Sequence, residues 1–255
     1  MMTLLLRKHV RSGETIIEFV SADPGCRRLL ELLDRTPKPC AIIGISIRPD
    51  PDVVAAFRSR AIPFVLIDEE AEGATTVACD NLAGGLLAGR HLACLGERTA
   101  AVVCGRRGVG GGRHAVLRVK GFERALAERG VALADENVLE VIDYTSKSGM
   151  AAMIDLLTRR PAIRAIFCAA GDLCAMGMLS VARQEHLQIP EQVAIIGFDD
   201  HPMSGICSPP LTTIRQPLER IAAEAFRLAV SEAAATDARS QKVLFEPELI
   251  LRQSA

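Results

Sequence analysis

The chain has 255 residues, of which 49% are hydrophobic, and its formal net charge is −1 at pH 7. This length suits one large α/β domain or two modest lobes. The near-neutral charge argues against a nucleic-acid-binding surface spread over the whole chain, and no separate basic module is visible in the sequence.

Short apolar runs rich in β-branched residues alternate with helical patterns along most of the chain. Runs of this kind, apolar at every position, are typical of parallel strands that are covered on both faces. The predicted strands are 16–20, 40–45, 64–68, 75–80, 99–104, 138–144, 165–169 and 193–199.

The segments between these strands carry helix signals. Asn81 and Asp172 occupy predicted N-cap positions, Pro217 suits a first helical turn, and Gly96 and Gly130 follow predicted helix ends. Repeated βα units predict doubly wound parallel sheets. The predicted helices are 24–34, 51–60, 81–95, 115–129, 147–159, 172–187 and 217–235.

The order of these elements predicts two lobes that exchange chain segments. A helix ends at Gly96 and a new βα series begins, so we place the first crossing at 95–100. The chain returns near Pro217, and the tail from residue 243 reads as a closing extended segment. We therefore predict a first lobe of residues 1–99 plus 217–242, and a second lobe of 100–216 plus 243–255.

The stretch 193–217 delivers two adjacent carboxylates, Asp199 and Asp200, to the carboxyl end of a buried strand. Ligands of open α/β sheets bind at this edge. Ionised carboxylates are strong acceptors for the hydroxyl groups of a polyol and also suit a cation. An Asx turn that closes the strand is the structural alternative, and the two acids can divide these roles.

Two further residues are placed to meet a ligand. Arg118 lies early in the helix that follows the glycine-rich stretch 105–112, which lacks the spacing of a nucleotide-binding loop. An ordinary solvated helix arginine is the alternative. Tyr144, the only tyrosine, ends a predicted strand, where it can stack on the apolar face of a sugar or fill the core.

The sequence gives no sign of an enzyme or a metal protein. His201 follows the two acids, but no nucleophile is signalled beside it, so we predict no catalytic residue. The 8 cysteines lack CxxC and paired-histidine spacing, which argues against zinc and favours a reducing cytoplasm. No apolar run reaches the roughly 18 residues of a membrane span.

Several longer motifs occur together: IPFVLID (62–68), CDNLAGG (79–85), HLACLGERTAAVVCG (91–105), RVKGF (118–122), AIFCAAGDLCAMGML (165–179), IPEQVAIIGFDD (189–200) and PPLTTIRQP (209–217). With the ending ELILRQSA they form a highly specific combination. From about residue 14 to its last residue, the chain resembles the effector-binding domain of the lac-repressor/galactose-repressor family of bacterial transcription regulators.

The resemblance implies the periplasmic-binding-protein-like fold, in which two lobes, each a doubly wound parallel sheet, close around a small effector. By motif, Arg118 and Asp199 would bind sugar hydroxyls, and Tyr144 would line the cleft. Gln216 would lie at the hinge crossing near the site. Where the family usually has an asparagine that contacts the effector, this chain has Gly171. The resemblance implies no cofactor.

The front of the chain departs from the family pattern. Family members begin with a helix-turn-helix and a hinge helix, and we recognise neither here. The segment before ETIIEFVSAD, MMTLLLRKHVRSG, resembles the end of the family's first helix. We therefore expect the first lobe to lack its first strand.

The sequence thus predicts an effector-sensing domain of a bacterial transcription regulator, which binds a sugar or sugar derivative. We expect a cytoplasmic homodimer that reaches DNA only through a helix-turn-helix not present in this chain. The alternative is a free-standing cytoplasmic sugar-binding protein without a role at DNA.

Overall fold

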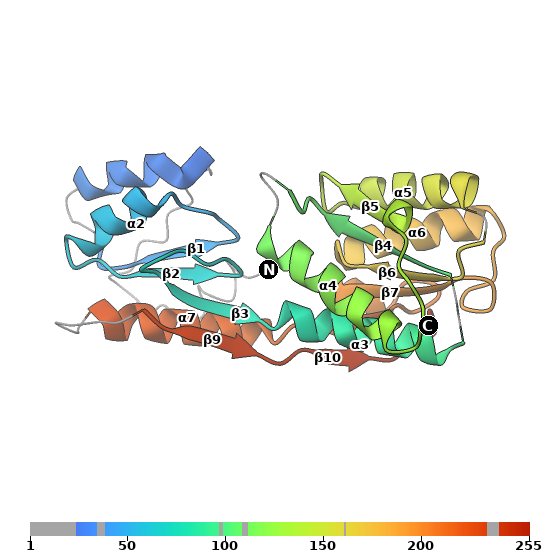
Figure 1. The fold of residues 1–255 in the computed structure, drawn as a ribbon. Coiled ribbons are helices and arrows are strands. Elements are labelled where there is room, and N and C mark those ends of the chain that lie inside the picture. Colours follow the sequence, from blue (N-terminus) through green and yellow to red (C-terminus); the bar gives the residue numbers. More distant parts are fainter. Residues whose placement is uncertain (1–23, 35–38, 97–98, 109–111, 161, 234–239) are drawn as a thin grey trace. The chain divides into compact units, whose positions relative to one another are not determined.

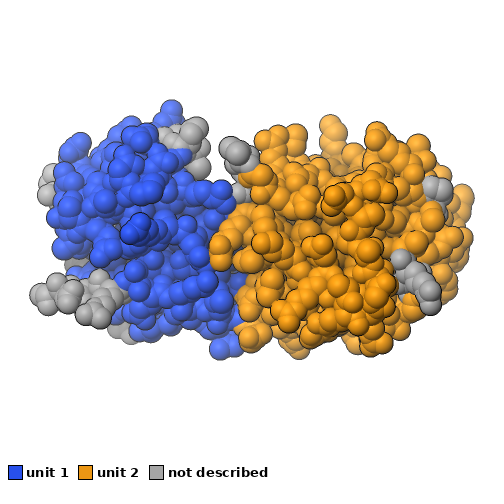
Figure 2. All heavy atoms as spheres, viewed as in Figure 1, with its two compact units in different colours: residues 1–79, 217–245 blue, residues 80–216, 246–255 orange. Residues whose placement is uncertain are grey.

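The computed structural model describes residues 24–34, 39–96, 99–108, 112–160, 162–233 and 240–255. The chain forms two compact units: residues 1–79 with 217–245, and residues 80–216 with 246–255 (Figure 2). The predicted strand 16–20 lies outside the described residues, as does the segment on which the expectation of a missing first strand depends.

The first unit is built on a four-stranded parallel sheet in the order β1-β2-β3-β9 (Figure 1). Both faces of this sheet are covered, as the run FVLI predicts: Phe64 and Leu66 pack with Phe57, whereas Val65 and Ile67 pack with α7. The elements are η1 (Pro24–Asp34), β1 (Ile42–Ile45), α2 (Pro51–Arg58), β2 (Phe64–Ile67), β3 (Thr75–Cys79), α7 (Leu218–Ala233) and β9 (Lys242–Phe245).

The second unit is built on a six-stranded sheet in the order β10-β8-β7-β6-β4-β5, in which only β10 is antiparallel to its neighbour. Its elements are α3 (Asn81–Cys94), β4 (Ala100–Gly105), α4 (Arg113–Ala127), η2 (Asp135–Asn137), β5 (Val138–Val141), α5 (Ser146–Arg159), β6 (Ala165–Cys168), α6 (Asp172–Gln184), β7 (Ala194–Asp199), η3 (Pro202–Gly205), β8 (Thr212–Arg215) and β10 (Glu248–Ile250).

Helices cover both faces of this second sheet. Alternate strand residues such as Ile166 pack with α5 and α6, whereas Phe167 and Phe198 pack with α3 and α4. The prediction of an α/β fold with two doubly wound, mostly parallel sheets is therefore confirmed. No helix among the described residues combines the length and the apolar character needed to cross a membrane.

The unit boundaries differ from the predicted lobe boundaries at two places. Helix α3 was expected in the first lobe but belongs to the second unit, because it packs along α4. Gly85 and Gly121 allow this close approach, since a Cβ on either would collide with a backbone carbonyl of the other helix. Residues 243–245 belong to the first unit because β9 pairs with β3. The first unit resumes at Pro217.

Two predicted helix caps are wrong by one residue. The carboxylate of Asp80, not Asn81, caps α3 by accepting a hydrogen bond from the N–H of Ala83 at 2.9 Å. Gly171 occupies the N-cap position of α6, and Asp172 begins the helix itself. The carboxylate of Asp172 is thereby free to turn into the protein interior.

A substitution of Gly121→Ala tests the close packing of α3 on α4. The added Cβ would collide with the carbonyl oxygen of Leu82, which is backbone and cannot rotate away. We expect the free energy of unfolding, measured by urea denaturation, to fall by about 1–3 kcal/mol. Gly108→Ala is the control, because its Cβ would meet no atom within 4 Å, and it should change stability by less than about 0.5 kcal/mol. Equal unfolding midpoints for the two variants would contradict this account of the packing.

Candidate functional site

Asp199 is the last residue of β7. Its carboxylate accepts a hydrogen bond from Gln216, the residue that follows β8. The Nε2 group of Gln216 donates a hydrogen bond to Oδ1 of Asp199 at 2.6 Å. The backbone here is unusual, since Asp199 has φ 110° and Asp200 has φ 52°. Residues with side chains rarely adopt such angles, and they do so mainly where a surrounding structure fixes them at functional sites.

Arg118 lies on α4 and is almost fully buried, with 5% of its surface exposed. Its Nε donates to Oδ1 of Asn81 at 2.8 Å, and its Nη1 donates to the carbonyl oxygen of Ala169 at 2.9 Å. The guanidinium carbon lies 3.5 Å from the centroid of the Phe198 ring, a cation–π geometry. Three different elements thus fix this buried charge next to the end of β7.

The charge of Arg118 acts on Asp199. Burial raises the pKa of the Asp199 carboxyl above its usual value, while Arg118, the hydrogen bond from Gln216 and the charge of His201 oppose that rise. The carboxylate therefore has electrostatic support inside the protein, although its environment disfavours the ionised form.

Two acceptor oxygens in this cluster are not used by the protein. Oε1 of Gln216 is buried and has no hydrogen-bond partner among the described residues. Oδ2 of Asp199 likewise accepts no hydrogen bond from the part of the chain that the structure describes. Unsatisfied acceptors beside a buried guanidinium suit a ligand that carries hydrogen-bond donors.

Gly171 also belongs to this cluster. Its φ of 107° and ψ of 167° lie in a region that essentially only glycine adopts. A Cβ at this position would lie 2.9 Å from Oδ2 of Asp199. The structure thus brings together four of the five predicted ligand-binding residues, namely Arg118, Gly171, Asp199 and Gln216.

Tyr144, the fifth, lies after β5 and is 43% exposed. Its hydroxyl oxygen is 3.2 Å from Nε2 of His114, and its ring covers Gly105 at the end of β4. Parallel strands end at the same edge of a sheet, so Tyr144 and Asp199 share the carboxyl edge of the second unit's sheet.

Asp200 has a different role from Asp199. It forms ion pairs with Arg215 at 2.7 Å and with Arg252 at 2.6 Å, and Arg215 also contacts Glu248 at 3.2 Å. Burial alone would raise the pKa of Asp200, but the two arginines outweigh it and hold that pKa below its usual value. These contacts join the end of β7 to β8, β10 and the C-terminal tail.

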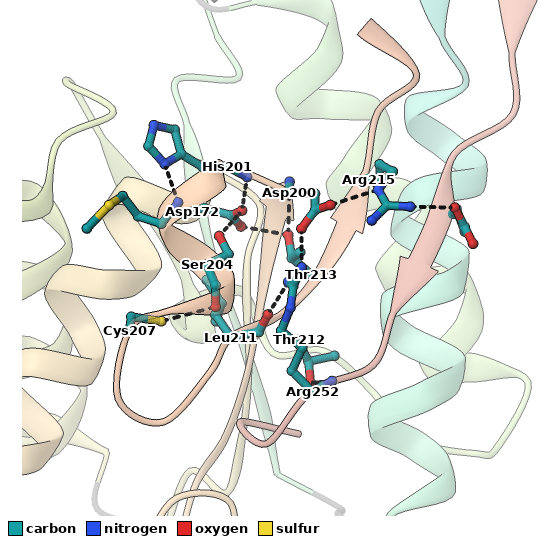
Figure 3. Close-up of polar contacts among 12 residues, drawn as sticks. Asp172, Asp200, His201, Ser204, Cys207, Leu211, Thr212, Thr213, Arg215 and Arg252 are labelled. Carbon is teal, nitrogen blue, oxygen red and sulfur yellow. Dashed lines mark hydrogen bonds and ion pairs between the residues drawn. The ribbon is translucent and has the colours of Figure 1, made fainter.

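The surroundings of Asp172 could not be read from the sequence. This carboxylate is 1% exposed and accepts hydrogen bonds from Ser204, Thr213 and the backbone N–H of His201. Figure 3 shows these groups converging on Asp172 from the segments around η3 and β8. The sequence likewise did not indicate that Asn81 would be a partner of Arg118. No group of three or more His, Cys, Asp or Glu side chains that could hold a metal ion occurs among the described residues.

The sequence of the chain matches a known domain family and known transcription regulators. Residues 90–255 match the family model described as a periplasmic binding protein-like domain. The chain is 34% identical to the HTH-type transcriptional repressor PurR of Erwinia tasmaniensis, over 81% of this chain and 60% of that protein. It is 30% identical to the HTH-type transcriptional regulator CelR of Thermobifida fusca, over 84% and 62%. The chain spans about three fifths of the length of these relatives.

Solved structures agree with the sequence matches. A transcriptional regulator CelR–cellobiose complex superposes with a TM-score of 0.81 at 28% identity, covering 89% of this chain and 69% of that one. A regulatory protein of the LacI family from Chloroflexus aggregans gives 0.81 at 25% identity, covering 92% and 84%. These relatives are transcription regulators, which confirms the expectation that the protein is not an enzyme. The chain therefore belongs to the periplasmic binding protein-like domains that form the effector-binding part of LacI-family transcription regulators.

Proposed function

We propose that this protein senses a sugar-like small molecule through the cluster of Arg118, Asp199 and Gln216. The observation that carries the proposal is the pair of unused acceptors, Oδ2 of Asp199 and Oε1 of Gln216, beside the buried Arg118. A ligand with neighbouring hydroxyl groups can donate to both oxygens and accept from the guanidinium.

The remaining predicted residues have complementary roles in this proposal. Gly171 leaves the space beside Oδ2 of Asp199 free for a group of the effector. Tyr144 offers an aromatic face to the apolar C–H groups of a sugar ring. The relative solved as a cellobiose complex supports a carbohydrate as the ligand class.

The regulatory part of the proposal rests on the family. Effector binding closes the two units on the ligand, and closure changes the affinity of a cytoplasmic homodimer for its operator. The curated relatives are named HTH-type regulators. We assign DNA recognition to a helix-turn-helix outside the residues that the structure describes.

Asp199→Asn tests the carboxylate. The variant keeps the shape of the side chain and an acceptor for Gln216 but removes the charge that receives the ligand's hydroxyl groups. Isothermal calorimetry with cellobiose and a panel of monosaccharides should show about a 10- to 100-fold loss of affinity for whichever probe the unchanged protein binds. Asp155→Asn, an α5 carboxylate paired with Arg159, is the control and should bind like the unchanged protein. Full affinity in Asp199→Asn would refute the assignment.

Arg118→Lys tests the guanidinium. Lysine keeps the positive charge but cannot reach Asn81 and Ala169 with a rigid fork of donors while facing the ligand. We expect affinity for the same probe to fall by about tenfold or more. Arg124→Lys, an exposed arginine on the same helix, should leave affinity unchanged. Equal affinities in the two variants would mean that Arg118 does not bind the effector.

A further inference from the structure

Asp172 is a buried carboxylate that the proposed ligand contacts do not use. Its Oδ2 accepts from the hydroxyl of Ser204 at 2.6 Å and from the backbone N–H of His201 at 2.7 Å. Its Oδ1 accepts from the hydroxyl of Thr213 at 2.6 Å. Hydrogen bonds to an ionised acceptor are among the strongest that a protein makes, so this side chain ties α6 to two other segments.

These segments flank the turn formed by Asp199 and Asp200, which we call the effector-site turn. His201 and Ser204 follow Asp199 and Asp200 in the chain, and Thr213 lies on β8, which pairs with β7. The oxygen of Thr213 is also 3.5 Å from the backbone nitrogen of Asp200. Gly197 on β7 makes room for the arrangement, because a Cβ there would collide with Oδ1 of Asp172. Figure 3 shows Asp172 between the His201 and Thr213 sides of this turn.

The turn needs such support because of its backbone. Asp199 and Asp200 are consecutive residues with φ of 110° and 52°. Side-chain-bearing residues keep such angles only when their surroundings leave no alternative. Asp200 is held from one side by Arg215 and Arg252. Asp172 supplies the hold from the other side.

We propose that Asp172 is a positioning residue, which acts through His201, Ser204 and Thr213 to fix the backbone of Asp199 and Asp200 in the orientation that presents Asp199 to the effector. The purpose of this positioning, to present Asp199 to the effector, rests on the proposed function. That it fixes the turn is independent of any ligand.

The protonation of Asp172 makes this role measurable, because it should change the turn over a defined range of pH. Burial raises its pKa from 3.8 to about 6, although its three donors oppose that rise, and the nearby charge of Asp199 adds to it. The folded protein therefore binds this proton between about pH 6 and 4, where the unfolded chain has released it. The thiols of Cys168 and Cys207 also interact with Asp172, and its charge helps to raise the pKa of each thiol. His201 bonds to Asp172 through its backbone N–H, whereas its ring accepts a hydrogen bond from the N–H of Met203.

Protonation changes the hydrogen bonds around the turn. A neutral carboxyl has one O–H donor in place of an acceptor. A proton on Oδ1 makes the hydroxyl of Thr213 turn to accept, while Oδ2 still accepts from the hydroxyl of Ser204 and the N–H of His201. The bonds to Oδ2 become weaker, because the acceptor is no longer ionised. We therefore expect the turn to loosen as the pH falls through about 6, and effector affinity to fall with it.

The test is an NMR titration of the free protein between pH 7.5 and 4.5, which follows the carboxyl carbon of Asp172 and the backbone amides of residues 199–201. Carboxyl and amides should share one midpoint near pH 6. In Asp172→Asn, the amide transition should disappear, and the amides of Asp199 and Asp200 should be displaced at every pH. His201→Gln is the matched control, because it removes the imidazole ring and keeps the backbone N–H, and the transition should persist.

Two partner variants keep the test decisive if Asp172→Asn does not fold. Thr213→Val and Ser204→Ala each remove one donor that favours the ionised carboxylate, so each should raise the shared midpoint above that of the unchanged protein. Loss of the transition in His201→Gln, with persistence in Asp172→Asn, would overturn the proposal. Unmoved midpoints in both partner variants would also overturn it.

Effector binding forms a second arm of the experiment. With the probe that the unchanged protein binds, Asp172→Asn should reduce affinity by about 10-fold or more at pH 7.5 and remove the fall of affinity near pH 6. Unaltered affinity and pH profile would overturn the positioning role. If the unchanged protein binds no carbohydrate probe, the proposed function fails, and the amide titration alone decides the role of Asp172.

Discussion

The burial of the Arg118 charge is the constraint on which the rest of this site depends. A guanidinium that is removed from water is tolerated only where its donors find partners. Asn81 supplies one, the carbonyl of Ala169 another, and the ring of Phe198 lies under the charge. Asn81 lies on α3 and Arg118 on α4, and these helices approach closely at Gly85 and Gly121. The helix packing therefore sets the electrostatics at the end of β7.

The two adjacent carboxylates at the end of β7 have different roles. Asp199 faces the buried arginine and keeps an unused oxygen, whereas both oxygens of Asp200 are engaged by Arg215 and Arg252. Arg252 also donates to the carbonyl of Leu211, and the buried hydroxyl of Ser254 bonds to β7 and to Thr212. The last residues of the chain thus hold the segment that carries the effector-site turn.

The predictable parts of this structure are those that depend on local pattern. The run FVLI predicted a strand covered on both faces, because each of its residues is apolar. In the structure all four residues are buried, and they pack alternately into the clusters on the two faces of the sheet. The unit to which α3 belongs was not predictable from local pattern, since it depends on the close approach of α3 to the backbone of α4. The role of Asp172 was also hidden, because Ser204 and Thr213 lie 32 and 41 residues away in sequence. A carboxylate next to a helix start reads locally as a cap.

Gly171 fixes the shape of the turn between β6 and α6. An asparagine at this position would have to adopt φ 107° and ψ 167°, a conformation that residues with a Cβ avoid. Its Cβ would also lie 2.9 Å from Oδ2 of Asp199. The turn between β6 and α6 therefore has a form that suits glycine, and the same turn begins the helix whose first residue, Asp172, bonds the segment after Asp199. Gly171 thus sets the geometry with which the chain enters α6 and presents the carboxylate of Asp172.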